Sequence, residues 1–406
     1  PQLERALAWI LNDRDLRLAD EEEAVQCLFA WRDTGRLLLL LDGLDELSPE
    51  ERASVTDQVR NFVNHDRNRK LNNRVVLTSR LTGYSPVGGP FQEYTLKPFQ
   101  KGEESRPFLR NWLHISRPDW NEPTLEQKTD DLWQQLQQQE ALRRILTTPL
   151  ILRMAAENYA RTQTVARHRS ELYRQYWETL WERAEERDAP PELKETCFAA
   201  LEALAFHLHT GGKNDAQTVE TVLREGAKKL LSDRQPVSEN DLPPLLPIVN
   251  RQMGLLVRVG EGYRFSHQTF QEYGAAGYLA QAWRKNRVGC WRFLQPRLHL
   301  PEWREPILLL GGSLAPEETD ELVRRVLQAG SPGEAVLLRD LRLAAALIGK
   351  GIPVSEEIRN AVLQRARFYL FPPGIHRLRK FSLFPARWQI TVELQVRAVE
   401  VLRSLG

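Results

Sequence analysis

The stretch LLLLLDGLDEL, residues 37–47, decides the fold. Five consecutive leucines predict a buried strand, because parallel strands are covered on both faces and lack polar alternation. Three carboxylates, Asp42, Asp45 and Glu46, follow the strand directly. Ligands of open α/β sheets bind just beyond the carboxyl ends of the strands, and acids gathered there are unfavourable unless they meet a cation or take part in chemistry. Taken alone, the stretch fits a solvated turn that caps the next helix equally well.

The residues after this turn complete a strand–helix–strand unit. Apolar residues between 55 and 63 follow helical spacing, and RVVLTSR at residues 74–80 reads as a short β-branched strand that ends in hydroxyls and Arg80. The order predicts a parallel strand pair with a right-handed crossover. Residues 91–98, FQEYTLKP, read as one further short strand.

Composition narrows the class of protein. A chain of 406 residues exceeds the size of a single core, and 56 basic against 54 acidic residues leave a formal charge of only +2. Cys27, Cys197 and Cys290 lie far apart, which predicts a reducing, cytoplasmic location. No apolar run approaches the roughly 20 residues that span a bilayer, so no membrane partner is expected. Because the chain opens at Pro1 without a methionine, we expect a fragment of something longer.

Helical patterns dominate from Phe99 onward. Three helices around residues 108–114, 124–138 and 140–160 predict a small helical domain. Further helices, a hairpin and a helix that begins at His267 are predicted next; the helices and the two hairpin strands cover residues 169–186, 192–209, 218–231, 255–259 and 263–265. Two helix pairs follow and suggest HEAT-like repeats; they cover residues 305–310 with 317–327 and 334–348 with 355–369.

Five motifs occur in a fixed order between residues 37 and 280. They are LLLLLDGLDEL, VVLTSR, YTLKPF, ILTTPLIL at 145–152 and RFSHQTFQEYGAAGYLA at 264–280. In this order they resemble the signatures of NACHT-type signal-transduction ATPases of the STAND class. The resemblance implies a predominantly α-helical protein with four parts: the latter part of an α/β P-loop NTPase core with a parallel sheet (1–98), a helical domain (99–165), a winged helix (166–290) and HEAT-like helical repeats (291–406).

The acidic turn fits the Walker B part of such an ATPase. Hydrolysis of a nucleoside triphosphate needs a magnesium ion and an acid that orients water. Asp42 is placed to hold Mg²⁺, and either Asp45 or Glu46 would polarise the attacking water, with Glu46 preferred. Arg80 resembles the sensor arginine that reads the terminal phosphate, although it could instead pair with Asp42 or Asp45 in a structural salt bridge.

Two further residues are candidates for nucleotide contact. Pro149 resembles the proline that packs on the adenine in this family, and its alternative role is a kink in a core helix. His267 resembles the histidine that binds the β-phosphate of ADP and locks the closed state. A lone histidine is otherwise more often an ordinary surface or core group, so this alternative stays open.

The phosphate-gripping part of an ATPase is missing from these 406 residues. No GxxxxGKS or GxxxxGKT occurs, and Gly211-Gly212-Lys213-Asn214 lies between winged-domain helices. We expect the P-loop upstream of Pro1. Without it, hydrolysis is not expected from this chain.

The sequence therefore predicts an ATP/ADP-dependent switch that needs Mg²⁺, senses a trigger and self-oligomerises to activate an effector in antiphage defence. The alternatives are a winged-helix transcription regulator of the same superfamily and a catalytically inactive helical scaffold. The basic stretch IHRLRK at residues 375–380 reads better as a solvated helix end than as a nucleic-acid site.

Overall fold

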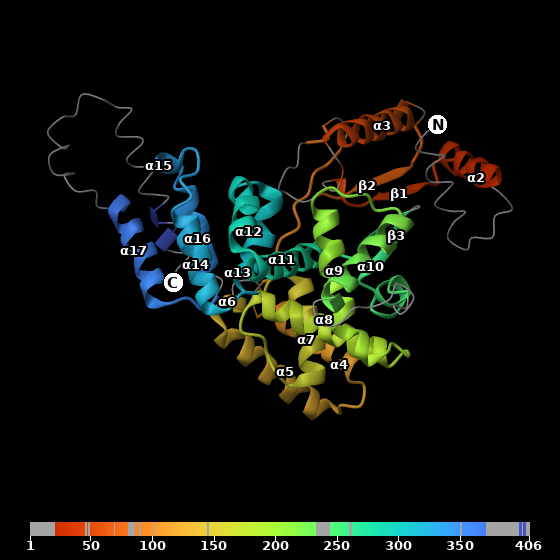
Figure 1. The fold of residues 1–406 in the computed structure, drawn as a ribbon. Coiled ribbons are helices and arrows are strands. Elements are labelled where there is room, and N and C mark those ends of the chain that lie inside the picture. Colours follow the sequence, from red (N-terminus) through yellow and green to blue (C-terminus); the bar gives the residue numbers. More distant parts are fainter. Residues whose placement is uncertain are drawn as a thin grey trace, which may run out of the picture. The chain divides into compact units, whose positions relative to one another are not determined.

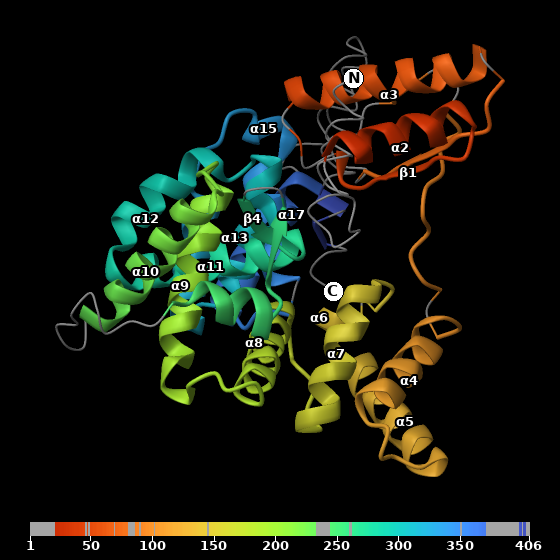
Figure 2. The ribbon, with the colours of Figure 1, turned by 90° about the vertical axis from the view of Figure 1, so that its right-hand side faces the viewer.

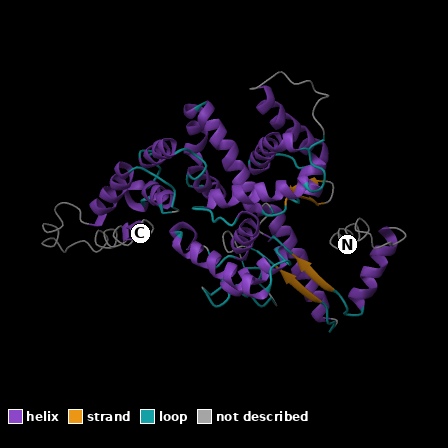
Figure 3. Cartoon of the chain, turned by 90° about the horizontal axis from the view of Figure 1, so that it is seen from below, coloured by secondary structure: helices purple, strands orange, loops and turns teal. Residues whose placement is uncertain are grey.

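The computed structural model describes most of the chain and is predominantly helical, with two small sheets among the described residues (Figures 1 and 3). The structure describes residues 21–44, 47, 49–68, 70–79, 86–88, 91–100, 102–143, 146–232, 244–259, 262–349, 351–370, 398–399 and 401–402. The chain divides into two compact units, residues 1–97 and 98–406.

The first unit contains the predicted strand pair. Its described elements are α2 (Glu21–Asp33), β1 (Leu38–Leu41), α3 (Pro49–Asn68) and β2 (Arg74–Leu77). The strands are parallel and in register from Leu38 opposite Arg74 to Leu41 opposite Leu77, which confirms the predicted pairing. The carboxyl ends of both strands therefore meet at one edge of the sheet, where Asp42 follows β1.

The exposure of β1 differs from the prediction of a strand buried on both faces. Leu39 is 4% exposed, whereas Leu38 and Leu40 are 55% and 69% exposed. Successive side chains of a strand point to opposite faces, so one face of this sheet is covered and the other is open. The strand predicted at 91–98 is absent: these residues have no backbone ladder among the described strands, and Leu96 is 95% exposed.

The second unit begins with a helical group. It consists of α4 (Ser105–Ser116), α5 (Glu122–Gln138), α6 (Glu140–Arg143) and α7 (Pro149–Thr162), with α4 packed against both α5 and α7 (Figure 2). One helix was predicted over residues 140–160, which is wrong because the chain breaks before Pro149. Thr148 is extended, as expected of a residue before proline, and Pro149 occupies the first position of α7.

A helical core with a hairpin follows. Its elements are α8 (Arg169–Glu185), the 3-10 turn Pro191–Leu193, α9 (Lys194–His209), α10 (Ala216–Ser232), the π-helical turn Ile248–Gln252, β3 (Leu256–Val259), β4 (Gly262–Phe265) and α11 (Gln268–Lys285). The strands pair antiparallel, and Asp215 bridges to Gly262, so the predicted hairpin is confirmed. Helix α9 packs against α10 and α11. The contact with α11 is close at Gly274, where an added Cβ would lie only 2.6 Å from the Cβ of Ala205 on α9.

Short helices make up the rest of the unit. They are α12 (Arg287–Leu294), the 3-10 turns Gln295–Arg297 and Pro301–Trp303, α13 (Arg304–Gly311), α14 (Pro316–Leu327), α15 (Glu334–Leu337), α16 (Arg339–Ile348) and α17 (Glu356–Leu370). The single helix predicted over 334–348 is interrupted, because Leu338 adopts a left-handed conformation that ends α15. The repeat character of this region stays a prediction.

One hydrophobic core runs through the second unit from Leu109 to Val401. Its largest fully buried side chains include Trp177, Trp181 and Trp283, and Tyr176 stacks on Phe270 to join α8 to the first turn of α11. None of the helices in the described part of the chain is long and apolar enough to cross a membrane.

Candidate functional site

Asp42 sits where the ends of β1 and β2 are tied together. The Thr78 hydroxyl donates a hydrogen bond to Asp42 Oδ1 and accepts one from the Gly43 amide at 3.0 Å. The Leu44 amide donates to the Thr78 carbonyl at 2.9 Å. Gly43 has a φ of 81°, which favours glycine and lets the chain turn away directly after Asp42. The carboxylate is therefore exposed but held in place by a neighbouring strand.

Such a carboxylate suits magnesium that also binds a nucleotide. Mg²⁺ keeps several waters and uses one or two carboxylates plus phosphate oxygens, so a complete protein cage is not needed. Within the described residues, no group of three or more His, Cys, Asp or Glu side chains is arranged to hold a metal. Asp45, Glu46 and Arg80 lie outside the described residues, so their roles, the choice between the two acids and the alternative salt bridge of Arg80 stay predictions.

The second unit contains a pocket beside His267 that we call the His267 pocket. Its volume is about 360 Å³. The pocket lies among α7, α8, the Ile248–Gln252 turn with the loop after it, and the start of α11. Four of the lining side chains are arginines and none is acidic; the charged and polar members are Arg153, Arg183, Arg187, Arg251, Gln252, Ser266 and His267. The other walls are largely apolar, including Leu150, Tyr176, Leu180, Met253, Leu255 and Phe270.

His267 is the N-cap residue of α11, as the sequence predicted for the start of this helix. Its backbone is extended, and its Nδ1 accepts a hydrogen bond from the Thr269 amide at 3.2 Å. Because Nδ1 accepts this bond, the neutral ring carries its proton on Nε2 and can donate from that atom. The ring also packs edge-on against Phe270, with centroids 6.2 Å apart.

A buried carboxylate holds two of the arginines. Glu157 on α7 is 2% exposed and pairs with Arg153 at 2.7 Å and with Arg183 of α8 at 2.8 Å. Burial alone would lower the pKa of Arg153, but its hydrogen bond to Glu157 keeps that pKa above the usual value. Both guanidinium groups are therefore held at the wall of the pocket by Glu157.

Backbone contacts hold a third arginine. Arg187 donates to the carbonyls of Gln252 at 3.0 Å and Arg251 at 3.4 Å, and the Gln252 amide donates to the Arg187 carbonyl at 2.9 Å. The Gln252 side-chain oxygen is buried and has no hydrogen-bond partner in the described part of the chain. A cationic rim, an apolar wall and one unused buried acceptor fit a ligand that has phosphate groups and a donor-bearing ring.

Pro149 and His267 were predicted separately; His267 lines the His267 pocket, and Pro149 is not among its lining residues. Pro149 is exposed, and the next residue, Leu150, lines the His267 pocket. The alternative role of Pro149, a kink within a helix, is wrong, because the residue begins α7 instead. Asp42 belongs to the first unit, where its carboxylate contacts Thr78.

Sequence reasoning did not assign Thr78, Glu157, Arg153 or Arg183 a role. The spacing of Arg153 and Glu157, four residues apart, was a visible signal for a pair on one helix face. Arg183 comes from another helix, so no local pattern could place it beside Glu157. Thr78 lies within the quoted VVLTSR motif, where its hydroxyl could be read only as the polar end of a strand.

Residues 169–279 match the family model for the winged helix-turn-helix domain C-terminal to NACHT. The matched segment runs from α8 into α11 and includes the hairpin, His267 and Arg183. The match confirms the winged helix, which is the part of the predicted architecture that carries His267. No curated protein matches the chain.

Proposed function

We propose that the protein is a nucleotide-dependent signalling switch of the NACHT and STAND type, which binds ADP or ATP with Mg²⁺. The observation that carries this proposal is the His267 pocket, where an N-capping histidine of a NACHT-associated winged helix shares the lining with four arginines. The exposed Asp42, tied to β2 by Thr78, supports a magnesium ligand in the first unit.

Charge explains why the pocket would take a diphosphate. Four arginines against the one carboxylate of Glu157 leave three positive charges at the wall. Arginine matches phosphate geometry with paired N–H donors, and His267 Nε2 adds a neutral donor at the first turn of α11. The apolar residues Leu150, Tyr176 and Met253 offer a surface for the rest of the nucleotide.

The pocket also offers a mechanism for switching. It is built from α7 of the helical group and from α8 and α11 of the winged helix, so a ligand there contacts both parts. A ligand shifts a conformational equilibrium only by its difference in affinity between the states. ADP that bridges the two parts would favour a closed state; ATP and a trigger would favour an open state that self-oligomerises and activates an effector, in defence.

Two measurements on the intact protein test this function. We expect ADP to be released from freshly purified protein on denaturation, identified by chromatography. Asp42→Asn and Glu46→Gln should each lower ATP turnover at least about tenfold, since each removes a charge that positions metal or water.

The control for Asp42 is Asp57→Asn, which removes an exposed carboxylate of α3 in the same unit and leaves the strand ends unchanged. This variant should keep most of the turnover. Equal turnover in wild type, Asp42→Asn and Glu46→Gln would contradict the assignment, as would the absence of any bound nucleotide.

A further inference from the structure

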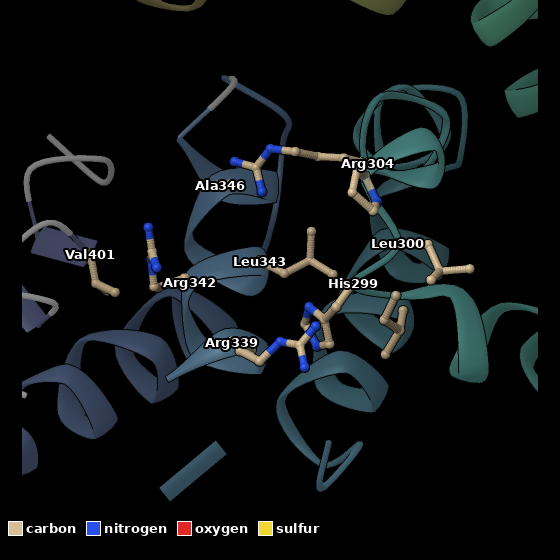
Figure 4. Close-up of a pocket in the computed structure, with 10 residues that line it drawn as sticks. His299, Leu300, Arg304, Arg339, Arg342, Leu343, Ala346 and Val401 are labelled. Atoms are coloured by element: carbon tan, nitrogen blue, oxygen red, sulfur yellow. The ribbon is translucent and has the colours of Figure 1, made fainter. Parts of the chain in front are cut away.

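A second basic pocket lies between α13 and α16, away from the residues that form the His267 pocket. We call it the Arg304 pocket; its volume is about 330 Å³ (Figure 4). Its charged lining residues are Arg304, Arg339 and Arg342, His299 also lines it, and no acidic side chain lines it within the described part of the chain. Leu343 and Ala346 of α16 supply an apolar floor.

The arginines of this pocket come from two helices. Arg304 opens α13, whereas Arg339 and Arg342 are three residues apart on α16 and so share a face. Figure 4 shows the side chain of Arg304 extending toward α16, Arg339 beside His299, and Leu343 between them. Among the described residues, neither Arg304 nor Arg339 has an ion-pair or side-chain hydrogen-bond partner.

A buried acid orients the histidine of the Arg304 pocket. Asp340 is 0% exposed; its Oδ1 lies 2.7 Å from His299 Nε2, and its Oδ2 accepts the Ser331 amide at 2.9 Å. Asp340 therefore contacts His299 from the buried side and forms no ion pair with Arg304 or Arg339 among the described residues. Because Nε2 faces Asp340, the other ring nitrogen is the atom left for the pocket.

Arginines that line the same pocket repel each other, and an anion that binds between them relieves this repulsion. Guanidinium groups recognise phosphate oxygens with paired hydrogen bonds, and a cavity near 330 Å³ is at the small end of ligand sites. We propose that the Arg304 pocket binds a small phosphorylated molecule whose phosphate is held by Arg304 and Arg339 and whose carbon part rests on Leu343. This site is independent of the proposed nucleotide pocket.

The test uses inorganic phosphate and phenyl phosphate as probes, titrated calorimetrically into the intact protein at low salt. Wild type is compared with Arg304→Gln, with the double variant Arg304→Gln/Arg339→Gln and with the control Arg359→Gln, an exposed arginine of α17 outside the pocket. We expect the double variant to bind phenyl phosphate at least about tenfold more weakly and the single variant to be intermediate, since each arginine supplies charge-assisted bonds. Phenyl phosphate should bind about tenfold tighter than phosphate, because its ring is removed from water.

Several results would overturn the proposal. They are equal affinity in wild type and the double variant, loss of affinity in Arg359→Gln of the same size, and no binding of either probe to wild type. A loss that appears in His267→Asn and not in the double variant would assign the phosphate to the His267 pocket instead. Binding of a ten-nucleotide single strand without binding of phenyl phosphate would replace the small ligand with nucleic acid. The variants change exposed or half-buried side chains, so thermal unfolding should stay near that of wild type.

Discussion

The two basic pockets of the second unit differ in what holds their arginines. In the His267 pocket, the buried Glu157 fixes Arg153 and Arg183, and backbone carbonyls fix Arg187. In the Arg304 pocket, the buried Asp340 holds His299, while Arg304 and Arg339 have no such partner among the described residues. In one pocket an ion-pair network that joins two helices holds the arginines, and in the other Arg304 and Arg339 lack such a network within the described part of the chain.

The two arrangements of arginines favour ligand binding in different ways. Fixed guanidinium groups lose little freedom when a ligand arrives, so they favour tight and specific binding. The two ion pairs of Glu157 also stabilise the fold without any ligand. Unpaired arginines contribute nothing to the free protein, and their value is realised only on binding.

Glu157→Gln should have the largest effect on folding. The change leaves Arg153 and Arg183 without their buried carboxylate. We therefore expect the free energy of unfolding to fall by about 3 kcal/mol. This value is below the top of the range for buried pairs, because Arg153 is partly exposed. Denaturant unfolding measures it. The matched control is Glu182→Gln, which breaks a surface pair between the same two helices and should cost less than about 1 kcal/mol. Similar losses in both variants would remove the distinction between buried and surface pairs.

Asp340→Asn should have the next largest effect, on the other pocket. Asparagine lacks the negative charge that faces His299 and that accepts the hydrogen bond of the Ser331 backbone amide. We therefore expect the free energy of unfolding to fall by about 2 kcal/mol in the same assay. Asp320→Asn provides the control, because Asp320 accepts a similar amide hydrogen bond from Ser355 nearer the surface. If Asp340→Asn leaves both stability and phenyl phosphate binding unchanged, the buried acid has no part in positioning His299.

Part of this architecture was readable from the sequence. The continuous leucines of residues 37–41 and the β-branched run at 74–77 predicted the parallel pair, because each pattern is local. The hairpin and the helix that begins after His267 were predicted for the same reason. The breaks before Pro149 and at Leu338 were missed, since apolar periodicity continues through both and only the backbone conformation reveals the interruption.

Salt should distinguish the pockets by affinity. Raising KCl from 50 to 300 mM should weaken phenyl phosphate binding at the Arg304 pocket about fivefold and ADP binding about twofold, because mobile, exposed charges are screened more than fixed ones. Calorimetric titration of each ligand at both salt concentrations measures the ratio. Equal salt dependence would show that the ion pairs of Glu157 do not set the two pockets apart.

The smallest effect is expected from a change in pH, which acts on stability through Glu334, whose carboxylate lies at the start of α16. Burial raises the pKa of Glu334, which caps α16 by accepting the Asp340 and Leu341 amides. A raised carboxyl pKa means that the contribution of Glu334 is fully present below the ordinary value of about 4.3 and is lost as pH rises through the folded-state value. Unfolding followed between pH 4 and 7 should therefore be flatter for Glu334→Gln, by less than about 1 kcal/mol. Parallel pH curves would exclude this role.

The site itself was less predictable than the fold. Pro149 and His267 were singled out because each lies in a motif at a helix start. His267 lines the His267 pocket, whereas Pro149 only precedes Leu150, which lines it. The four arginines of the pocket come from three separate segments that meet only through tertiary packing. No spacing in the sequence therefore predicts that they lie together. Thr78 likewise acts across the sheet, through a contact that depends on the register of β1 and β2.

The central claim is that His267 retains a nucleoside diphosphate, and the rate of ADP release from the intact protein tests it most directly. His267→Ala removes both the ring and the helix cap, whereas His267→Asn keeps a good cap for α11 and removes only the ring donor. We predict that fluorescently labelled ADP, displaced by excess unlabelled ADP, leaves both variants at least about tenfold faster than wild type, as expected for the loss of a phosphate contact. Release from His267→Asn at the wild-type rate would contradict the account.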